Sequence, residues 1–108
     1  WAEENRPLLV RFLKAMVLTN RWLYDHKEAA VDFLAKEMKL KPAYARKGWE
    51  YYTENRLWPP DADINLEGLK TVIQIYGEQT QIKGAPPSAA KYVDQSYLRE
   101  ALRELGAR

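Results

Sequence analysis

Apolar residues recur at helical spacing along almost the whole chain of 108 residues, and this period limits what the chain can fold into. The first stretch that shows it contains Leu9, Phe12, Leu13, Met16, Val17, Leu23 and Tyr24. Steps of three and four residues place such side chains on one face of an α-helix. No alternating apolar and polar run is long enough to indicate a strand. The sequence therefore predicts an all-α fold of about five amphipathic helices.

Residues typical of helix ends divide the chain into these five segments. Pro7 is expected at the first position of helix one, where a missing N–H costs nothing. Asp25 ends that helix, and with Glu28 three residues later it resembles a capping box for helix two. Pro42 is expected to open helix three. Asn65 is expected to cap helix four.

The inward faces follow from the same period. They are predicted to comprise Ala30, Phe33, Leu34 and Met38 in helix two, Ala45, Gly48, Trp49 and Tyr52 in helix three, and Leu66, Leu69, Val72, Ile73 and Tyr76 in helix four. Gly48 predicts close approach of a neighbouring backbone, since glycine otherwise weakens a helix interior. On the outer face of helix three, Arg46 and Glu50 are expected to pair at i,i+4.

The last helix has the clearest signals of the five. Asp94 is placed to cap it, and Gly106 is a natural stop. Between them lies the stripe of Tyr97, Leu98, Ala101, Leu102 and Leu105. Two irregular connectors are predicted, at 58–61 and 84–88, because their prolines cannot supply helical N–H groups.

Composition fits one soluble domain, and residues 1–108 are treated as a single all-helical region. The chain is 46% apolar and 30% charged and has no cysteine, which removes disulfide and thiolate chemistry. Residues 1–47 hold ten basic and six acidic side chains, a net +4, and residues 48–108 hold seven and nine, a net −2. Neither net charge is large enough to predict a nucleic-acid or membrane partner. The start at Trp1 rather than Met favours a processed or truncated chain.

One short segment superficially resembles a calcium loop. Asp61, Asp63 and Asn65 place oxygen donors at alternate positions. Such a loop also needs glycine at its sixth position and a bidentate carboxylate at its twelfth. This chain has Leu66 and Val72 there. The pattern favours capping and turn formation, and no metal site is predicted.

No set of residues predicts catalysis. His26 is the single histidine, without a second ligand for zinc and without a Ser or Cys partner for nucleophilic attack. The carboxylate pairs Glu50 with Glu54 and Asp61 with Asp63 are interpreted as solvated side chains. Phosphate-binding glycine motifs are absent, so no nucleotide cofactor is expected.

The segment 36–58 mixes cations with aromatic rings, a combination that can bind nucleic acid. Its members are Lys36, Lys39, Lys41, Arg46, Lys47, Trp49, Tyr51, Tyr52 and Trp58. Helical spacing puts Trp49 and Tyr52 on the apolar face with Ala45 and turns Arg46 and Lys47 away. Because this separates rings from cations, no nucleic-acid partner is expected.

Several stretches are similar, in order along the chain, to one family of transport proteins. They are Glu4–Ala15, Trp22–Asp25, Lys27–Leu40, Trp58–Pro59 followed by Ile64–Leu69, and Lys91–Leu102. These resemble the C-terminal part of the substrate-binding proteins of ABC importers for nitrate, sulfonates, taurine and thiamine precursors. Arg6 departs from the pattern, because it interrupts the family's usual Asn-Pro pair.

The resemblance implies a helical tail of a two-lobed α/β protein that closes on a small solute and delivers it to a membrane permease. It implies a periplasmic or extracytoplasmic location and no enzymatic activity. It transfers no ligand-contact residue, so the solute-binding residues are unknown. Helices cut from such a fold would expose apolar stripes, and we expect the isolated chain to self-associate through helix one or helix three. The alternative is an autonomous helical module that binds a partner helix or peptide.

Overall fold

The computed structural model describes residues 1–80 and 83–106, and the described residues form five α-helices and no strand. The helices are α1 (Arg6–Asp25), α2 (Lys27–Glu37), α3 (Pro42–Glu54), α4 (Leu66–Gln79) and α5 (Ser96–Leu105), with a short 3-10 helix, η1 (Ala89–Tyr92), before α5. The prediction of an all-α chain with five helices is confirmed.

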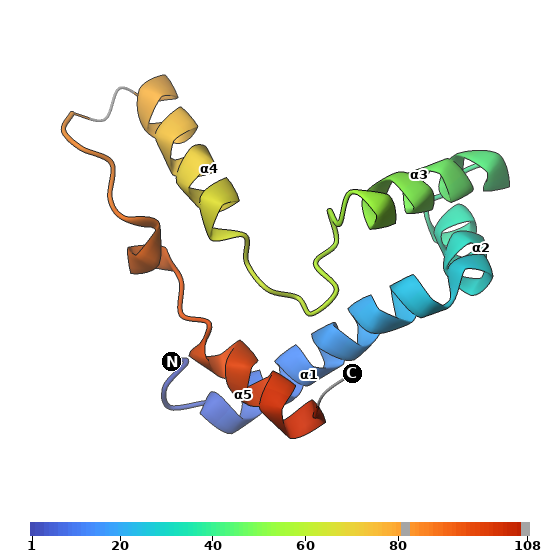
Figure 1. Cartoon of the computed structure of the whole chain (residues 1–108), viewed down its shortest axis with the longest axis horizontal. Coiled ribbons are helices and arrows are strands. Elements are labelled where there is room, and N and C mark those ends of the chain that lie inside the picture. Colours follow the sequence, from blue (N-terminus) through green and yellow to red (C-terminus); the bar gives the residue numbers. More distant parts are fainter. Residues whose placement is uncertain (81–82, 107–108) are drawn as a thin grey trace.

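The helices form an open arrangement rather than a closed bundle (Figure 1). The radius of gyration is 17.2 Å, whereas a compact chain of this length has about 13 Å. In Figure 1, α5 lies along the first half of α1, α2 and α3 pair at the far end of α1, and α4 stands apart beside the segment that leads to η1. Helix α1 therefore connects its contact with α5 at one end to the α2–α3 pair at the other, and α4 has little cover.

The pair of α1 and α5 brings the two ends of the chain together. Val10 and Val17 of α1 are buried, as are Tyr97, Leu98 and Ala101 of α5. The stripe predicted for the last helix is thus its packed face. Gly106 ends α5 with a φ of 77°, and its N–H donates to Leu102 O at 3.1 Å, so the predicted glycine stop is confirmed.

Charged side chains flank this apolar contact. Arg6 Nε donates to Glu100 Oε2 at 2.6 Å, and its guanidinium lies 4.4 Å from the centre of the Tyr97 ring. Lys14 pairs with Glu104, about two turns further along α1 and one turn further along α5. The Glu100 carboxylate raises the pKa of Arg6.

Helix α1 begins at Arg6, so the prediction that Pro7 takes the first position was wrong by one residue.

The cap predicted at Asn65 is confirmed, Asp94 bonds to the start of its helix from one position before the N-cap residue Gln95, and the predicted capping box is absent. Asn65 Oδ1 accepts the N–H of Gly68 at 2.9 Å, which caps α4 as expected. Asp94 Oδ1 accepts the N–H of Ser96, the first residue of α5, at 2.9 Å. The capping box was wrong, because the residue before α2 is His26, which makes no side-chain cap bond. The Glu28 carboxylate bonds to Arg46 instead.

Several side chains expected to face inward lie on the surface. Phe33 is 56% exposed and Met38 is 61% exposed, whereas the unpredicted Val31 is 1% exposed. In α4, no residue is buried. The expectation for Gly48 was also wrong, because a Cβ built there meets no atom within 4 Å.

The fully buried Val17 offers a direct test of the packing on α1. Val17 is 0% exposed and Leu18 beside it is 52% exposed. Val17→Ala should lower the free energy of unfolding by about 2 kcal/mol, because it removes buried methyl groups and leaves a cavity. Thermal unfolding should show a midpoint roughly 10 °C lower. Leu18→Ala is the matched control and should leave the midpoint nearly unchanged. An equal loss in both variants would contradict this packing.

Candidate functional site

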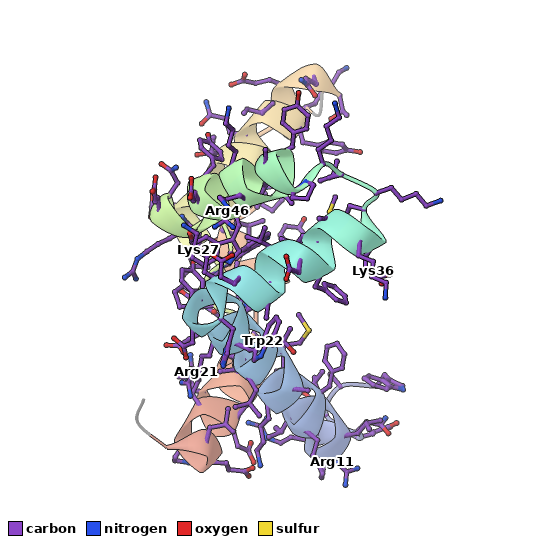
Figure 2. All side chains as sticks on the ribbon, turned by 90° about the vertical axis from the view of Figure 1, so that its right-hand side faces the viewer. Arg11, Arg21, Trp22, Lys27, Lys36 and Arg46 are labelled. Carbon is purple, nitrogen blue, oxygen red and sulfur yellow. The ribbon has the colours of Figure 1, made fainter. Side chains whose placement is uncertain are left out.

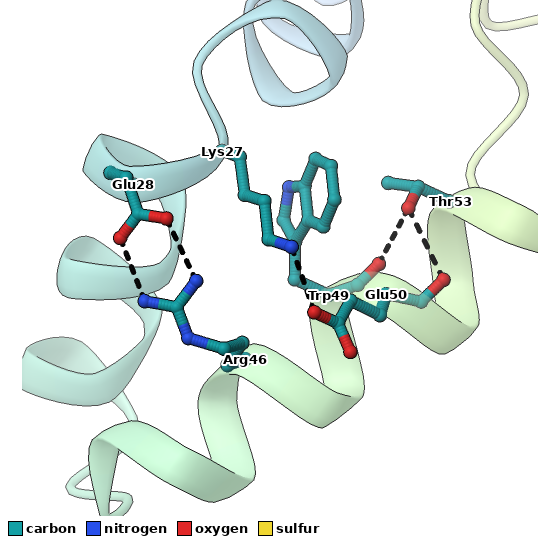
Figure 3. A network of polar contacts seen from close by, with 6 residues as sticks. All are labelled: Lys27, Glu28, Arg46, Trp49, Glu50 and Thr53. Carbon is teal, nitrogen blue, oxygen red and sulfur yellow. Dashed lines mark hydrogen bonds and ion pairs between the residues drawn. The ribbon is translucent and has the colours of Figure 1, made fainter.

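Ion pairs between α2 and α3 form the densest polar cluster of the described residues (Figure 3). Both guanidinium nitrogens Nη1 and Nη2 of Arg46 donate to the Glu28 carboxylate at 2.7 Å. Lys27 Nζ donates to Glu50 Oε1, also at 2.7 Å. A two-pronged arginine–carboxylate contact fixes both position and orientation. The expected pair of Arg46 with Glu50 within α3 was therefore wrong, since each residue has its partner in α2.

An indole links this cluster to α1. Trp49 Nε1 donates to Leu23 O at 2.8 Å, and Lys27 Nζ lies 5.4 Å from the centre of the Trp49 ring. Thr53 Oγ1 donates to Trp49 O at 2.9 Å and to Glu50 O at 3.2 Å. The arrangement holds α3 against the α1–α2 junction. It is a structural site, because each charged group in it has an opposite charge as partner.

The carboxylates of this cluster are more acidic than usual. Hydrogen bonding from Arg46 lowers the pKa of Glu28, and hydrogen bonding from Lys27 lowers the pKa of Glu50. Both groups are solvent-accessible, so water screens the two pairs and limits what each contributes.

The loop at 58–61 is attached to α1 by three contacts. Asn20 Nδ2 donates to Pro59 O at 2.8 Å, and the Tyr24 hydroxyl donates to Trp58 O. Arg21 Nη2 lies 3.0 Å from Asp61 Oδ1. This connector is irregular, as predicted, but it is held firmly and leads from α3 to α4.

The residues weighed for metal binding have other partners. Asp61 pairs with Arg21, and Asn65 caps α4. Asp63 is exposed in the turn between them. Within residues 1–80 and 83–106, no three His, Asp or Glu side chains are grouped so that they could hold a metal ion.

The residues weighed for catalysis are not brought together. His26 lies at the α1–α2 junction, where its ring stacks on Trp22 at a centroid distance of 5.3 Å. Glu50 pairs with Lys27, and the side chain of Glu54 is exposed at the end of α3. No nucleophile, base and orienting group converge among the described residues weighed for catalysis.

The mixed segment 36–58 separates into two parts. Two of its rings contact other parts of the protein, since the Trp49 indole bonds to α1 and Tyr52 stacks on Trp58 at a centroid distance of 4.9 Å. Tyr51 is 60% exposed, and Tyr52, which was predicted to face inward, is 42% exposed. Arg46 reaches α2 rather than solvent. Lys36, Lys39 and Lys41 around the turn from α2 to α3 are exposed, and Lys36 is labelled in Figure 2. No row of alternating cations and stacked rings is formed.

One side of α1 has an exposed apolar row at the spacing of a helix–helix seam. Leu8, Phe12, Ala15, Thr19 and Trp22 follow one another at steps of four, three, four and three residues. All five are exposed, and Phe12 is 58% exposed. A repeat of this kind suits a second helix or a packed surface laid along α1. Sequence reasoning assigned Phe12 to the inner face, and no local signal tells which of two apolar sides a partner covers.

A groove lies between α4 and the segment that precedes α5. It has a volume of about 670 Å³ and is lined mainly by apolar side chains, including Leu69, Val72, Ile73, Tyr76, Pro87 and Tyr92. Its walls are formed by one helix and one extended segment that run side by side in Figure 1. Sequence analysis had placed the α4 residues in a core and did not predict a groove.

Comparisons with protein families, with curated proteins and with solved structures find no match to this chain. Among the described residues, none of the helices has the length and apolar character required to span a bilayer. The functional interpretation therefore depends on the residues and surfaces described above.

Acid should weaken the α2–α3 contact. The pKa values of Glu28 and Glu50 lie below the ordinary value of 4.5, so the stability that they add is fully present above pH 4.5. It is lost as the pH falls through the lowered values. In thermal unfolding from pH 6 to pH 3, the double variant Glu28→Gln, Glu50→Gln should lose less stability than the parent chain. The control Glu3→Gln, Glu4→Gln should behave like the parent, and a double variant with the parental acid loss would contradict these ion pairs.

The exposed row on α1 should make the isolated chain self-associate. Sedimentation velocity at tens of micromolar, a range set by weak interfaces, should show species larger than a monomer. Leu8→Ser with Phe12→Ser should restore the monomer, because it interrupts the row. Leu57→Ser with Ile64→Ser changes two similarly exposed apolar residues outside the helices and should not. A monomeric parent chain would refute the expectation.

Proposed function

We propose that this chain is the C-terminal part of the substrate-binding component of an ABC importer for a small solute of the nitrate, sulfonate, taurine or thiamine-precursor type. Its role is non-enzymatic, and it acts in the periplasm or another extracytoplasmic space. In the full protein, the partners are the solute and the membrane permease.

The observation that carries this proposal is the uncovered apolar surface of well-formed helices. Helices α1 and α4 have complete apolar stripes, yet α4 buries no residue and the row from Leu8 to Trp22 is exposed. Monomeric proteins rarely leave contiguous apolar surface of this extent open. Helices that cover a sheet in a larger protein would have such faces, and this is the role of the helical tail in the family that the sequence resembles.

The order of the similar stretches supports the same proposal. Trp58–Pro59 lies in the loop attached to α1, and Ile64–Leu69 contains the cap and first turn of α4. Lys91–Leu102 spans the end of η1 and most of α5. Each stretch thus has a definite structural task as a cap, a stop or a packed face, which is why solute-contact residues cannot be assigned from them.

Solute binding by the full-length protein tests this function. Its thermal midpoint should rise with one solute from a panel of nitrate, taurine, alkanesulfonates and pyrimidine thiamine precursors, because ligand at 100 times Kd stabilises by about 2.7 kcal/mol. The 108-residue chain alone should show no shift with any of them, since the proposal places most of the pocket outside it. A native gene that begins and ends within these residues would refute the proposal.

The groove beside α4 favours a second candidate function, an autonomous helical module that binds a peptide. Its apolar lining and length along one helix suit an amphipathic helix or an extended segment. This reading requires a gene of about this length and saturable binding of a peptide in the groove. Val72→Asp should then abolish peptide binding without unfolding the chain, because Val72 is 61% exposed.

A further inference from the structure

The turn between α2 and α3 carries exposed apolar side chains placed between lysines. We call residues 36–44 the basic tip; it contains Lys36, Met38, Lys39, Leu40, Lys41 and Tyr44. Met38 is 61% exposed, Leu40 is 40% exposed and Tyr44 is 60% exposed. The tip lies at the end of the α2–α3 pair that is remote from α5 (Figure 1). It is therefore a projecting end of the molecule with a mixed apolar and cationic surface.

The lysines of the basic tip have no ion-pair partner among the residues that the structure describes. Lys36, Lys39 and Lys41 form no ion pair with any residue in 1–80 or 83–106, unlike the nearby Arg46, which bonds to Glu28. Glu37 is the single acidic residue within the tip. Figure 2 shows Lys36 extending away from α2. These charges are available to an anionic partner.

Backbone hydrogen bonds fix the shape of the tip. Met38 N donates to Leu34 O at 3.0 Å, and Leu40 N donates to Ala35 O at 2.9 Å. Lys39 between them has a φ of 54°, in the left-handed region that favours glycine. Met38 and Leu40 are therefore presented by a closed helix end rather than by a loose loop.

A surface that offers both negative charge and an apolar layer would satisfy this arrangement. Anionic phospholipid headgroups attract clustered lysines, and the acyl layer beneath accepts apolar side chains. Lysine stems can lie along such a boundary while the ammonium groups stay with the phosphates. A nucleic acid would neutralise the lysines but would leave Met38 and Leu40 in water. We infer that the basic tip docks on an anionic phospholipid membrane surface. This goes beyond the proposed transport function and does not depend on it.

Vesicle sedimentation with the 108-residue chain tests this inference. The chain should bind phosphatidylcholine vesicles that contain about one third phosphatidylglycerol and should not bind pure phosphatidylcholine. The triple variant Lys36→Gln, Lys39→Gly, Lys41→Gln should bind on the order of a hundred-fold more weakly, from about five-fold per lysine. Glycine at 39 keeps the backbone, since it adopts that φ without strain. Met38→Ser with Leu40→Ser should also weaken binding, because it removes the apolar anchor.

The matched control removes the same charge elsewhere. Lys83→Gln, Lys91→Gln, Arg103→Gln neutralises three exposed cations outside the tip and should keep most of the binding. Circular dichroism checks that each variant is helical. Equal loss in the tip and control variants would mean that net charge alone drives binding and would overturn the inference. Binding to pure phosphatidylcholine that matches binding to anionic vesicles would overturn it as well.

Discussion

The pairing of α1 with α5 is the contact on which the rest of the structure depends, because it joins the two ends of the chain. Ala101 of α5 and Val17 of α1 are fully buried, and Arg6 bonds to Glu100 across a separation of 94 residues. Closing so long a loop costs conformational entropy that local contacts cannot offset. A contact that combines buried apolar area with charged flanks can meet that cost.

Elements that depend on neighbouring residues could be predicted from the sequence. The five helices, the cap at Asn65, the stop at Gly106 and the irregular loop at 58–61 all follow from local spacing and backbone chemistry. Burial could not be predicted as well, because it depends on which face receives a partner. Phe12 and Val17 were both predicted to face inward from α1, yet Val17 is fully buried and Phe12 is 58% exposed.

Ion pairing shows the same limit. The i,i+4 rule assigned Arg46 to Glu50, but α2 brings Glu28 and Lys27 within reach and each forms a contact at 2.7 Å. These partners are 18 and 23 residues apart in sequence, so local spacing could not predict either ion pair. The groove at α4 and the lysine-rich turn at 36–44 could likewise not be predicted as surfaces, although the sequence analysis had named Leu69, Val72, Lys36 and Lys39 individually.

The three contacts between α1 and the loop at 58–61 couple the position of the loop to the position of α1. Asn20, Arg21 and Tyr24 hold that loop at the middle of the molecule, between the partner helix at one end of α1 and the helix pair at the other. Because α1 is one continuous helix of 20 residues, the elements attached along it are connected through one rigid helix. A rotation of α1 about its helix axis would therefore move the loop at 58–61, and with it the direction in which α4 starts.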